Sequence, residues 1–447
     1  MIVENLGLDK VVMTYPRVLL TRPLRRALMI GLMALFGLLA PTVILYSAGY
    51  RYDPNTGGIK VTGVISIAAE PADTQVTINN VRINKRPPFE LTNRAPGRYQ
   101  LRLEKTGFKP WEKEIVVESK QTTYIKNISL LREQLPVPVE WTLPTTSTSS
   151  LQFSGSPDGR YALTRVSESG IETITLFATE RTPAAVISRR ATTEPSLLSW
   201  SPGGSALFLA VRNNLGWRLT LIALADPSRT ASYRQEQAST PRWQWSQTND
   251  TVMFAPDGHK VIGLNLDGPT TVATITTDTI WFVTGERVVW TPAANHPPLP
   301  ETINLTTIVD INQKRIIGQT ANDLAIIKRA DNPPRIQTLP TPNVRYNPAT
   351  KEWLAWSAFE LWTIYENGEV KLLNRASDRI RAVEPLDENG VLLVVSDRGL
   401  NAFNPGYSVA HDLFLGQVES ASVNQKQRLI YFLGEVGGRR GVFQLEY

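Results

Sequence analysis

Residues 151–447 repeat a short unit that consists of an apolar strand, a polar turn and a second strand. Clear copies begin at Leu151, Leu197, Trp243 and Val344, and weaker copies begin near Ile280, Ile308, Ile380 and Ser422. The spacing of roughly 30 to 46 residues is that of one four-stranded blade, which must stack on its neighbours to bury its faces. The repeat therefore predicts a β-propeller at 151–447 with seven or eight blades. An extended array of β-sandwiches is the alternative.

The turns of the repeat have sequences similar to those of known propellers. Trp200-Ser-Pro-Gly-Gly and Ser156-Pro-Asp-Gly-Arg resemble the turns of TolB-like and WD40-like propellers. The Gly-His and Trp-Asp signature of WD40 repeats is absent, so the TolB-like form is closer. The last blade of such a ring can borrow a strand, and Val137–Leu143, within a predicted linker at 133–150, is the candidate.

An apolar stretch at residues 27–48 carries no charge. At 1.5 Å per residue a helix of this length reaches about 33 Å, enough to cross a hydrocarbon core of about 30 Å. Basic residues gather before the stretch, with Arg25 and Arg26 at its edge, whereas Tyr50 lies where aromatic side chains favour the far interface. The stretch therefore predicts a transmembrane helix that contacts the lipid bilayer.

The charge asymmetry also predicts the topology. We expect a single-pass protein of the plasma membrane, with residues 1–26 as a cytoplasmic tail, residues 49–61 as a linker and the bulk outside the cytoplasm. A cleaved signal peptide fits less well, because the run is long and cleavage after Ala48 would leave the bulky Tyr46 upstream. A buried core helix is disfavoured because no other helical pattern could surround it.

Residues 62–132 alternate apolar and polar side chains between turn residues, which is typical of half-buried strands. The succession runs from Glu70-Pro71 through Val76–Asn79, Pro87-Pro88-Phe89, Pro96–Tyr99 and Glu104–Phe108 to Trp111. This succession resembles the PEGA domain, with Arg98 and Phe108 as local departures. The resemblance implies a small β-sandwich that serves as a surface or spacer module, and it does not imply an enzyme.

Composition and motifs limit the chemistry that we expect. The chain has no cysteine, so disulfides and thiol nucleophiles are excluded, and its three histidines (His259, His296, His411) lack ligand spacing. Asp53–Gly58 begins like a calcium loop, but Val64 replaces the bidentate Glu. The net charge is +6 and the basic residues are scattered along the chain, which disfavours a nucleic-acid partner. We expect no cofactor and no metal.

Carboxylates from distant blades could still meet in the central channel of a propeller. The candidates are Asp310, Asp331, Glu384, Asp387 and Asp397. Two of them in one deep pocket would favour an exported hydrolase or lyase, which is the alternative hypothesis.

Tryptophans are dense in two repeats. They are Trp243, Trp245, Trp353, Trp356 and Trp362. They either pack between blades or form exposed surfaces that bind a partner. The leading hypothesis is a non-enzymatic, membrane-anchored scaffold whose propeller recognises a protein or a cell-envelope polymer.

Overall fold

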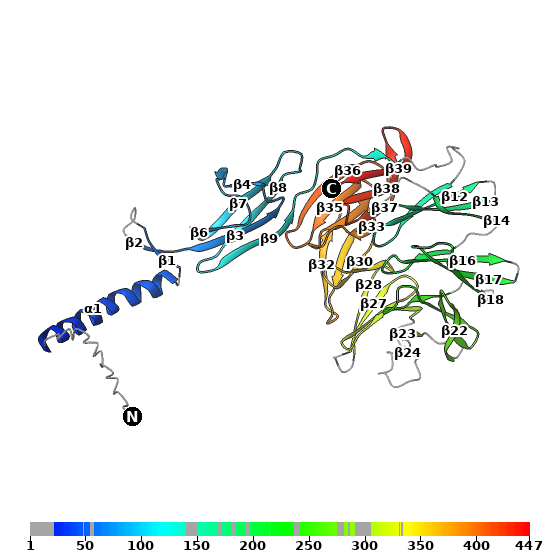
Figure 1. Cartoon of the computed structure of the whole chain (residues 1–447), viewed down its shortest axis with the longest axis horizontal. Coiled ribbons are helices and arrows are strands. Elements are labelled where there is room, and N and C mark those ends of the chain that lie inside the picture. Colours follow the sequence, from blue (N-terminus) through cyan, green and yellow to red (C-terminus); the bar gives the residue numbers. More distant parts are fainter. Residues whose placement is uncertain are drawn as a thin grey trace, which may run out of the picture. The chain divides into compact units, whose positions relative to one another are not determined.

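The structure is a computed structural model, and it describes residues 22–47, 49–53, 58–139, 150–168, 171–179, 185–192, 197–213, 215–236, 242–274, 281–284, 287–290, 305–329, 331 and 334–447. These residues are almost all β, with one helix among them, which confirms the predicted class (Figure 1). The helix is α1 (Arg22–Ser47), so it begins before the predicted residue 27 and includes Arg25 and Arg26.

Helix α1 is long and apolar enough to cross a membrane, with a mean hydropathy of 2.4 in its most apolar window. None of its residues is buried against the rest of the protein. The predicted linker at 49–61 contains an antiparallel hairpin of β1 (Tyr50–Asp53) and β2 (Gly58–Val61). Residues 54–57 of the calcium-like sequence lie outside the described residues, as do residues 1–21 of the predicted tail.

The PEGA-like segment forms two sheets, as predicted for a sandwich. One has the order β6-β3-β9 and the other β5-β4-β7-β8. The strands are β3 (Gly63–Glu70), β4 (Gln75–Ile78), β5 (Val81–Ile83), β6 (Phe89–Arg94), β7 (Gly97–Glu104), β8 (Trp111–Val117) and β9 (Thr122–Ser129). Burial alternates along them: Ile65 and Ile67 of β3 are buried between more exposed neighbours, which is the period of a sheet with one face in the core.

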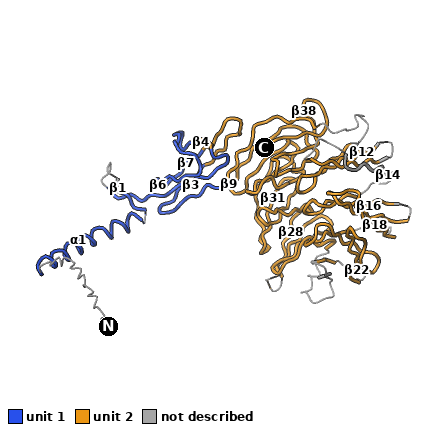
Figure 2. Tube along the Cα trace, viewed as in Figure 1, with its two compact units in different colours: residues 1–72, 76–101, 114–126 blue, residues 73–75, 102–113, 127–447 orange. Residues whose placement is uncertain are grey.

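The chain divides into two compact units (Figure 2). Unit 1 comprises residues 1–72, 76–101 and 114–126, and unit 2 comprises residues 73–75, 102–113 and 127–447. The division cuts through the segment predicted as one domain at 62–132, because several of its turns group with the C-terminal part.

Eight sheets follow in unit 2 among the described residues, seven of them with four strands. The first three are β11 to β14 (Ser150–Gly155, Tyr161–Glu168, Ile171–Ala178, Ala185–Thr192), β15 to β18 (Leu197–Trp200, Ala206–Asn213, Gly216–Ala223, Thr230–Gln235) and β19 to β22 (Gln244–Trp245, Met253–Asp257, Lys260–Asn265, Gly268–Thr274). The fourth has two described strands, β23 (Phe282–Thr284) and β24 (Arg287–Trp290).

The remaining four sheets complete the set. They are β25 to β28 (Thr307–Ile311, Arg315–Gln319, Leu324–Lys328, Arg335–Leu339), β29 to β32 (Val344–Asn347, Glu352–Trp356, Glu360–Ile364, Val370–Arg375), β33 to β36 (Ile380–Pro385, Leu392–Ser396, Gly399–Asn404, Val409–Leu415) and β37 to β39 (Val418–Asn424, Leu429–Val436, Arg439–Glu446) with β10 (Val137–Pro138). Their first strands begin at or near the starts that the repeat predicts.

The sheets form a closed ring. A buried apolar cluster lies between each sheet and the next, for example Leu163 and Leu176 with Leu207 and Ile222. The described residues contain eight such clusters, and the one that contains Phe153 and Tyr431 joins the last sheet to the first. The described residues therefore form eight blades of the predicted propeller, the larger of the two predicted numbers.

Strand β10 closes the ring. It pairs with β39 in the last sheet, with Val137 opposite Gln444 and Pro138 opposite Phe443. The last blade thus takes its fourth strand from the segment in which Val137–Leu143 was the candidate. Residues 140–143 of that segment lie outside the described residues.

In seven of the eight described sheets, the first strand ends in a turn with a side-chain cap. Ser201 Oγ, for example, accepts hydrogen bonds from the backbone N–H groups of Ser205 and Ala206, at 3.0 and 2.9 Å. The residues that accept at this position are Ser156, Ser201, Ser246, Asn312, Asn347, Asp387 and Asn424. Ser, Asn and Asp favour such turns because they accept from the backbone just ahead. We call the side of the ring that carries these residues the capped face.

Candidate functional site

Antiparallel blades give a propeller two different faces. In the seven sheets with a described cap, the first strand ends on the capped face, so the starts of these strands lie on the opposite side of the ring. We call that side the pocket face, because the cavity formed by Arg242, Trp243, Gln244, Trp281 and Thr306–Ile308 lies at the starts of β19, β23 and β25.

This cavity has a volume of about 260 Å³ and is lined by both apolar and polar side chains. Trp243 and Trp281 are both half-buried, and each directly precedes the first described strand of its blade. Ile308 is buried beneath them, whereas Arg242 and Thr307 are exposed. The described residues place no carboxylate among its lining residues, so the cavity presents one cationic group beside two indole rings.

The walls of the cavity are held in place by neighbouring blades. Gln244 bridges two of them: its Nε2 donates to the Val283 carbonyl at 2.8 Å, and its Oε1 accepts from the Val283 N–H at 3.0 Å. The Trp243 ring packs against Phe208, with 5.1 Å between ring centroids. Thr306 is fixed by its backbone N–H, which donates to the Gln319 carbonyl at 2.7 Å. Rigid walls reduce the entropy lost when a ligand binds.

The five tryptophans predicted as candidates differ in their surroundings. Trp243 lines the cavity, whereas Trp245 donates its indole N–H to Ser199 Oγ at 2.9 Å and packs between blades. Trp353 donates to Asp310 Oδ2 at 3.1 Å. Trp356 and Trp362 are only 8% and 7% exposed and belong to core clusters, which favours packing between blades, the first of their two predicted roles. They pack between blades because their strands have both faces covered.

The sequence prediction missed Trp281. The repeat that begins near Ile280 is weak, and its flanking residues 275–280 lie outside the described residues. A signal was nevertheless present, because Trp281 directly precedes its strand as Trp243 precedes β19.

The candidate carboxylates have structural roles. Asp310 forms an ion pair with the buried Arg315 at 2.7 Å, Glu384 pairs with Arg345, and Asp397 pairs with Arg381 at 2.5 Å. None of the five candidates is among the described residues that line the cavity beside Arg242 or a second cavity between Asn374 and Leu415.

The two remaining candidate carboxylates are Asp387 and Asp331. Asp387 caps its turn, and burial raises the pKa of its carboxyl although the Val391 and Asn389 N–H groups lower it. Asp331 is exposed.

The histidines also lie apart from one another. His259 is exposed in the turn between β20 and β21, His411 lies on β36, and His296 is outside the described residues. Burial first, and then the positive charge of Lys109, lower the pKa of His411. The part of the chain that the structure describes contains no group of three or more possible metal ligands.

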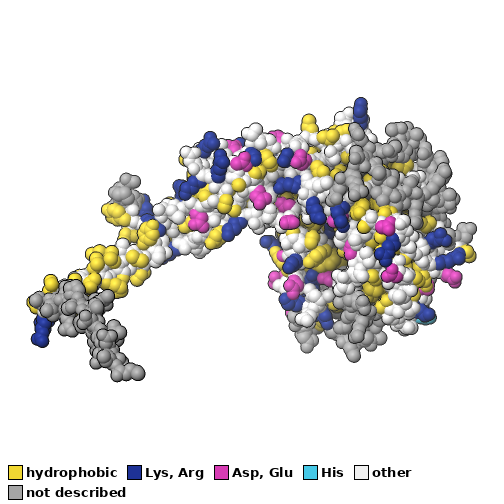
Figure 3. All heavy atoms as spheres, viewed as in Figure 1, with side chains coloured by type: hydrophobic (Ala, Val, Ile, Leu, Met, Phe, Trp, Pro, Cys, Tyr) yellow, Lys and Arg dark blue, Asp and Glu magenta, His cyan; other side chains and the backbone are white. Residues whose placement is uncertain are grey.

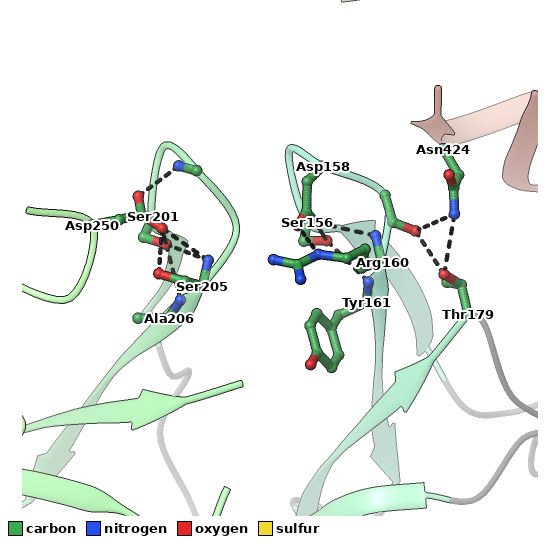
Figure 4. A network of polar contacts seen from close by, with 12 residues as sticks. Ser156, Asp158, Arg160, Tyr161, Thr179, Ser201, Ser205, Ala206, Asp250 and Asn424 are labelled. Carbon is green, nitrogen blue, oxygen red and sulfur yellow. Dashed lines mark hydrogen bonds and ion pairs between the residues drawn. The ribbon is translucent and has the colours of Figure 1, made fainter. Parts of the chain in front are cut away.

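The capped face is joined by hydrogen bonds between blades (Figure 4). The Asp250 carboxylate accepts from Ser201 Oγ at 2.8 Å, from the Gly203 N–H at 2.5 Å, and from the N–H and hydroxyl of Ser205. Asn424 Nδ2 donates to the Gly159 carbonyl at 3.1 Å and to Thr179 Oγ1 at 3.4 Å. These hydrogen bonds join one blade to the next, so the polar groups of this face hold neighbouring blades together.

The capped face also contacts residues that precede the propeller within unit 2. Asn389 Nδ2 donates to Ser129 Oγ at 3.0 Å, and the rings of Trp111 and Tyr407 meet edge to face at 5.4 Å. Leu131 joins the apolar cluster between the last two blades. Asn389 and Tyr407 lie in turns on the capped side of β33–β36, so this contact leaves the pocket face uncovered by these residues.

Comparison with known proteins identifies a family for one segment of the chain. No curated protein sequence matches the chain. The β-propeller domain of Myceliophteria thermophila Cps50 (Swd1) is similar in structure, with 14% identity, a TM-score of 0.40, and coverage of 68% of this chain and 98% of that one. A chain of the outer coat vertex of COPII on membranes has 11% identity, a TM-score of 0.39, and coverage of 67% and 84%. Residues 62–132 match the family model of the PEGA domain, as predicted, and the ring of sheets after it is a β-propeller.

Proposed function

We propose that the chain is a membrane-anchored, non-enzymatic binding protein, whose propeller recognises another exported protein through the pocket face. The observation that carries this proposal is the cavity that Arg242, Trp243 and Trp281 form. Arginine and tryptophan are the residue types that contribute most often to binding hot spots, because they combine a large contact area with hydrogen bonding.

The size and charge of the cavity indicate the kind of partner. A volume of about 260 Å³ lies below the range of about 300 to 1,000 Å³ that holds a drug-sized ligand. It therefore suits one large apolar side chain better than several linked sugar rings. Arg242 at the rim would pair with an acidic residue next to that side chain. A protein segment with an apolar residue beside an acidic one fits both features.

Helix α1 supports the anchoring part of the proposal. Its apolar side chains have no protein neighbours that would bury them, and Figure 3 shows hydrophobic side chains gathered along it. Such a surface is stable in hydrocarbon and unfavourable in water. The basic residues before it favour a cytoplasmic N-terminus, which would place the propeller outside the cytoplasm at the plasma membrane.

The experiment uses the full chain in detergent, immobilised and exposed to solubilised envelope proteins, with isolated cell-wall polymer as a parallel sample. Arg242→Glu reverses the charge at the cavity, and Lys426→Glu makes the same charge change at an exposed position of the capped face. We expect one protein to be retained by the wild type and by Lys426→Glu, and at least about tenfold less by Arg242→Glu.

Equal retention by the two variants would contradict the proposed site. Retention of the polymer but of no protein would assign the face to an envelope polymer instead.

A further inference from the structure

The hairpin β1–β2 has one apolar face and one basic face. Its register places Tyr52 opposite Ile59 and Arg51 opposite Lys60. Because side chains alternate along a strand, Tyr50, Tyr52, Ile59 and Val61 share one face, and Arg51 and Lys60 share the other.

The apolar face is open at the end farthest from the sandwich. Tyr52 is 69% exposed and Ile59 is 62% exposed, whereas Tyr50 and Val61 are half-buried. Large apolar side chains paired across two strands normally pack against another apolar surface, which buries them. The hairpin begins three residues after α1 ends, so this pair lies near the end of an exposed apolar helix.

Contacts within unit 1 hold the hairpin to the end of α1. The Arg51 guanidinium stacks over the Tyr46 ring at 3.5 Å and donates to the Tyr46 carbonyl at 2.5 Å. Its Nε donates to Asn93 Oδ1 in the sandwich at 2.7 Å. Lys120 Nζ donates to the Tyr50 hydroxyl at 2.8 Å. Arg51 therefore ties the helix, the hairpin and the sandwich together.

We propose that this hairpin is a second lipid contact, with Tyr52 and Ile59 inserted among the phospholipid headgroups of the leaflet in which α1 ends. The inference rests on the proposed anchoring of α1. It extends the lipid-contacting surface from α1 onto the hairpin β1–β2. Tyrosine favours this interfacial layer because its ring is apolar and its hydroxyl is polar. The contact would fix the orientation of the sandwich on the bilayer, because the Arg51–Asn93 hydrogen bond joins the hairpin to the sandwich.

The test uses the absence of cysteine from the chain, which allows a fluorophore to be attached at a single introduced site. The full-length variant Ile59→Cys is labelled and inserted into vesicles of phosphatidylcholine and phosphatidylglycerol that contain headgroup spin-labelled lipid. Val116→Cys is the matched control, because Val116 is an exposed apolar residue (54%) on strand β8 of the same unit. We expect at least about twofold stronger quenching at residue 59 than at residue 116. Equal quenching would overturn the inference.

A third labelled variant, Phe36→Cys in α1, separates this inference from the anchoring on which it depends. Quenching of residue 36 by acyl-chain spin labels, together with equal quenching at 59 and 116, would overturn the hairpin contact alone. Absence of quenching at residue 36 would overturn the anchoring and the hairpin contact together. A second measurement with the double variant Tyr52→Ser/Ile59→Ser should lower the quenching of a label at Lys60→Cys, whereas Val116→Ser should leave it unchanged.

Discussion

The two faces of the propeller differ in how their polar groups are used. On the capped face, Asp250 and Asn424 form hydrogen bonds with neighbouring blades, and the capping residues Ser201 and Asn347 are buried. On the pocket face, Arg242 and Thr307 are exposed beside half-buried indole rings. The difference suggests that one face maintains the ring and the other can change its surface chemistry without loss of the fold.

The largest effect is expected from Asp250→Ala on the capped face. The substitution removes an acceptor of four hydrogen bonds and leaves the buried Ser201 hydroxyl without it. We expect a loss of about 3 kcal/mol in the free energy of unfolding, measured by urea denaturation. Asp267→Ala is the control, because its carboxylate forms only a surface ion pair with Arg229; a change above about 0.5 kcal/mol there would be unexpected. An equally small change at Asp250 would remove the distinction between the two faces.

A somewhat smaller effect is expected from Gly155→Ala. A Cβ at residue 155 would overlap Ser422 of the last blade, because its nearest side-chain atom, Ser422 Oγ, lies only 1.9 Å from the Cβ position. Overpacking of this kind costs about 2 kcal/mol. The double variant Gly155→Ala/Ser422→Gly should recover part of the loss, because it removes the opposing side chain. A double variant whose loss equals the sum of the two single losses would show that the two blades do not meet there.

On the pocket face, Arg242→Glu should leave stability almost unchanged. Its side chain is exposed, and surface substitutions usually change the free energy of unfolding by less than about 0.5 kcal/mol. The comparison is sharpest when one preparation is measured twice, once by thermal unfolding and once for partner binding. A clear drop in the unfolding temperature would mean that the pocket face also maintains the ring.

The smallest effect concerns pH at the contact of the capped face with the preceding residues of unit 2. The pKa of His411 lies below its ordinary value of 6.5, chiefly because of burial and then because of Lys109. The unfolded chain therefore binds the proton more readily, so stability should fall as the pH drops from about 6.5 through the lower pKa of the folded state. His411→Gln should remove this part of the pH dependence, as measured by unfolding at pH 7 and pH 5. An identical pH dependence in the variant would exclude His411 as its source.

Much of the fold could be predicted because it depends on local patterns. The strand–turn–strand repeat marked the blades, since a Ser, Asn or Asp cap recurs after each clear first strand, as at Ser156 and Ser201. The ring-closing strand could be placed at Val137 because it is an isolated apolar segment before the first copy.

The site was only partly predictable, because it depends on contacts between distant residues. Trp243 and Trp356 look alike in the sequence, but one lines a cavity and the other is buried in a core cluster. The locking contact of Asp250 with Ser201 spans 49 positions and leaves no local signal. The hairpin at 50–61 was missed because its turn residues resembled those of a linker.

Site-specific crosslinking tests the central claim most directly, namely that the pocket face is the binding surface. A photoreactive amino acid is introduced at Thr307 on the pocket face and, in a second variant, at Thr350 on the capped face, both of which are exposed. Each full-length variant is expressed in cells and illuminated. We predict one defined protein adduct from position 307 that disappears when Arg242→Glu is added, and no such adduct from position 350. The same adduct from both positions, or an adduct from position 350 alone, would contradict the account.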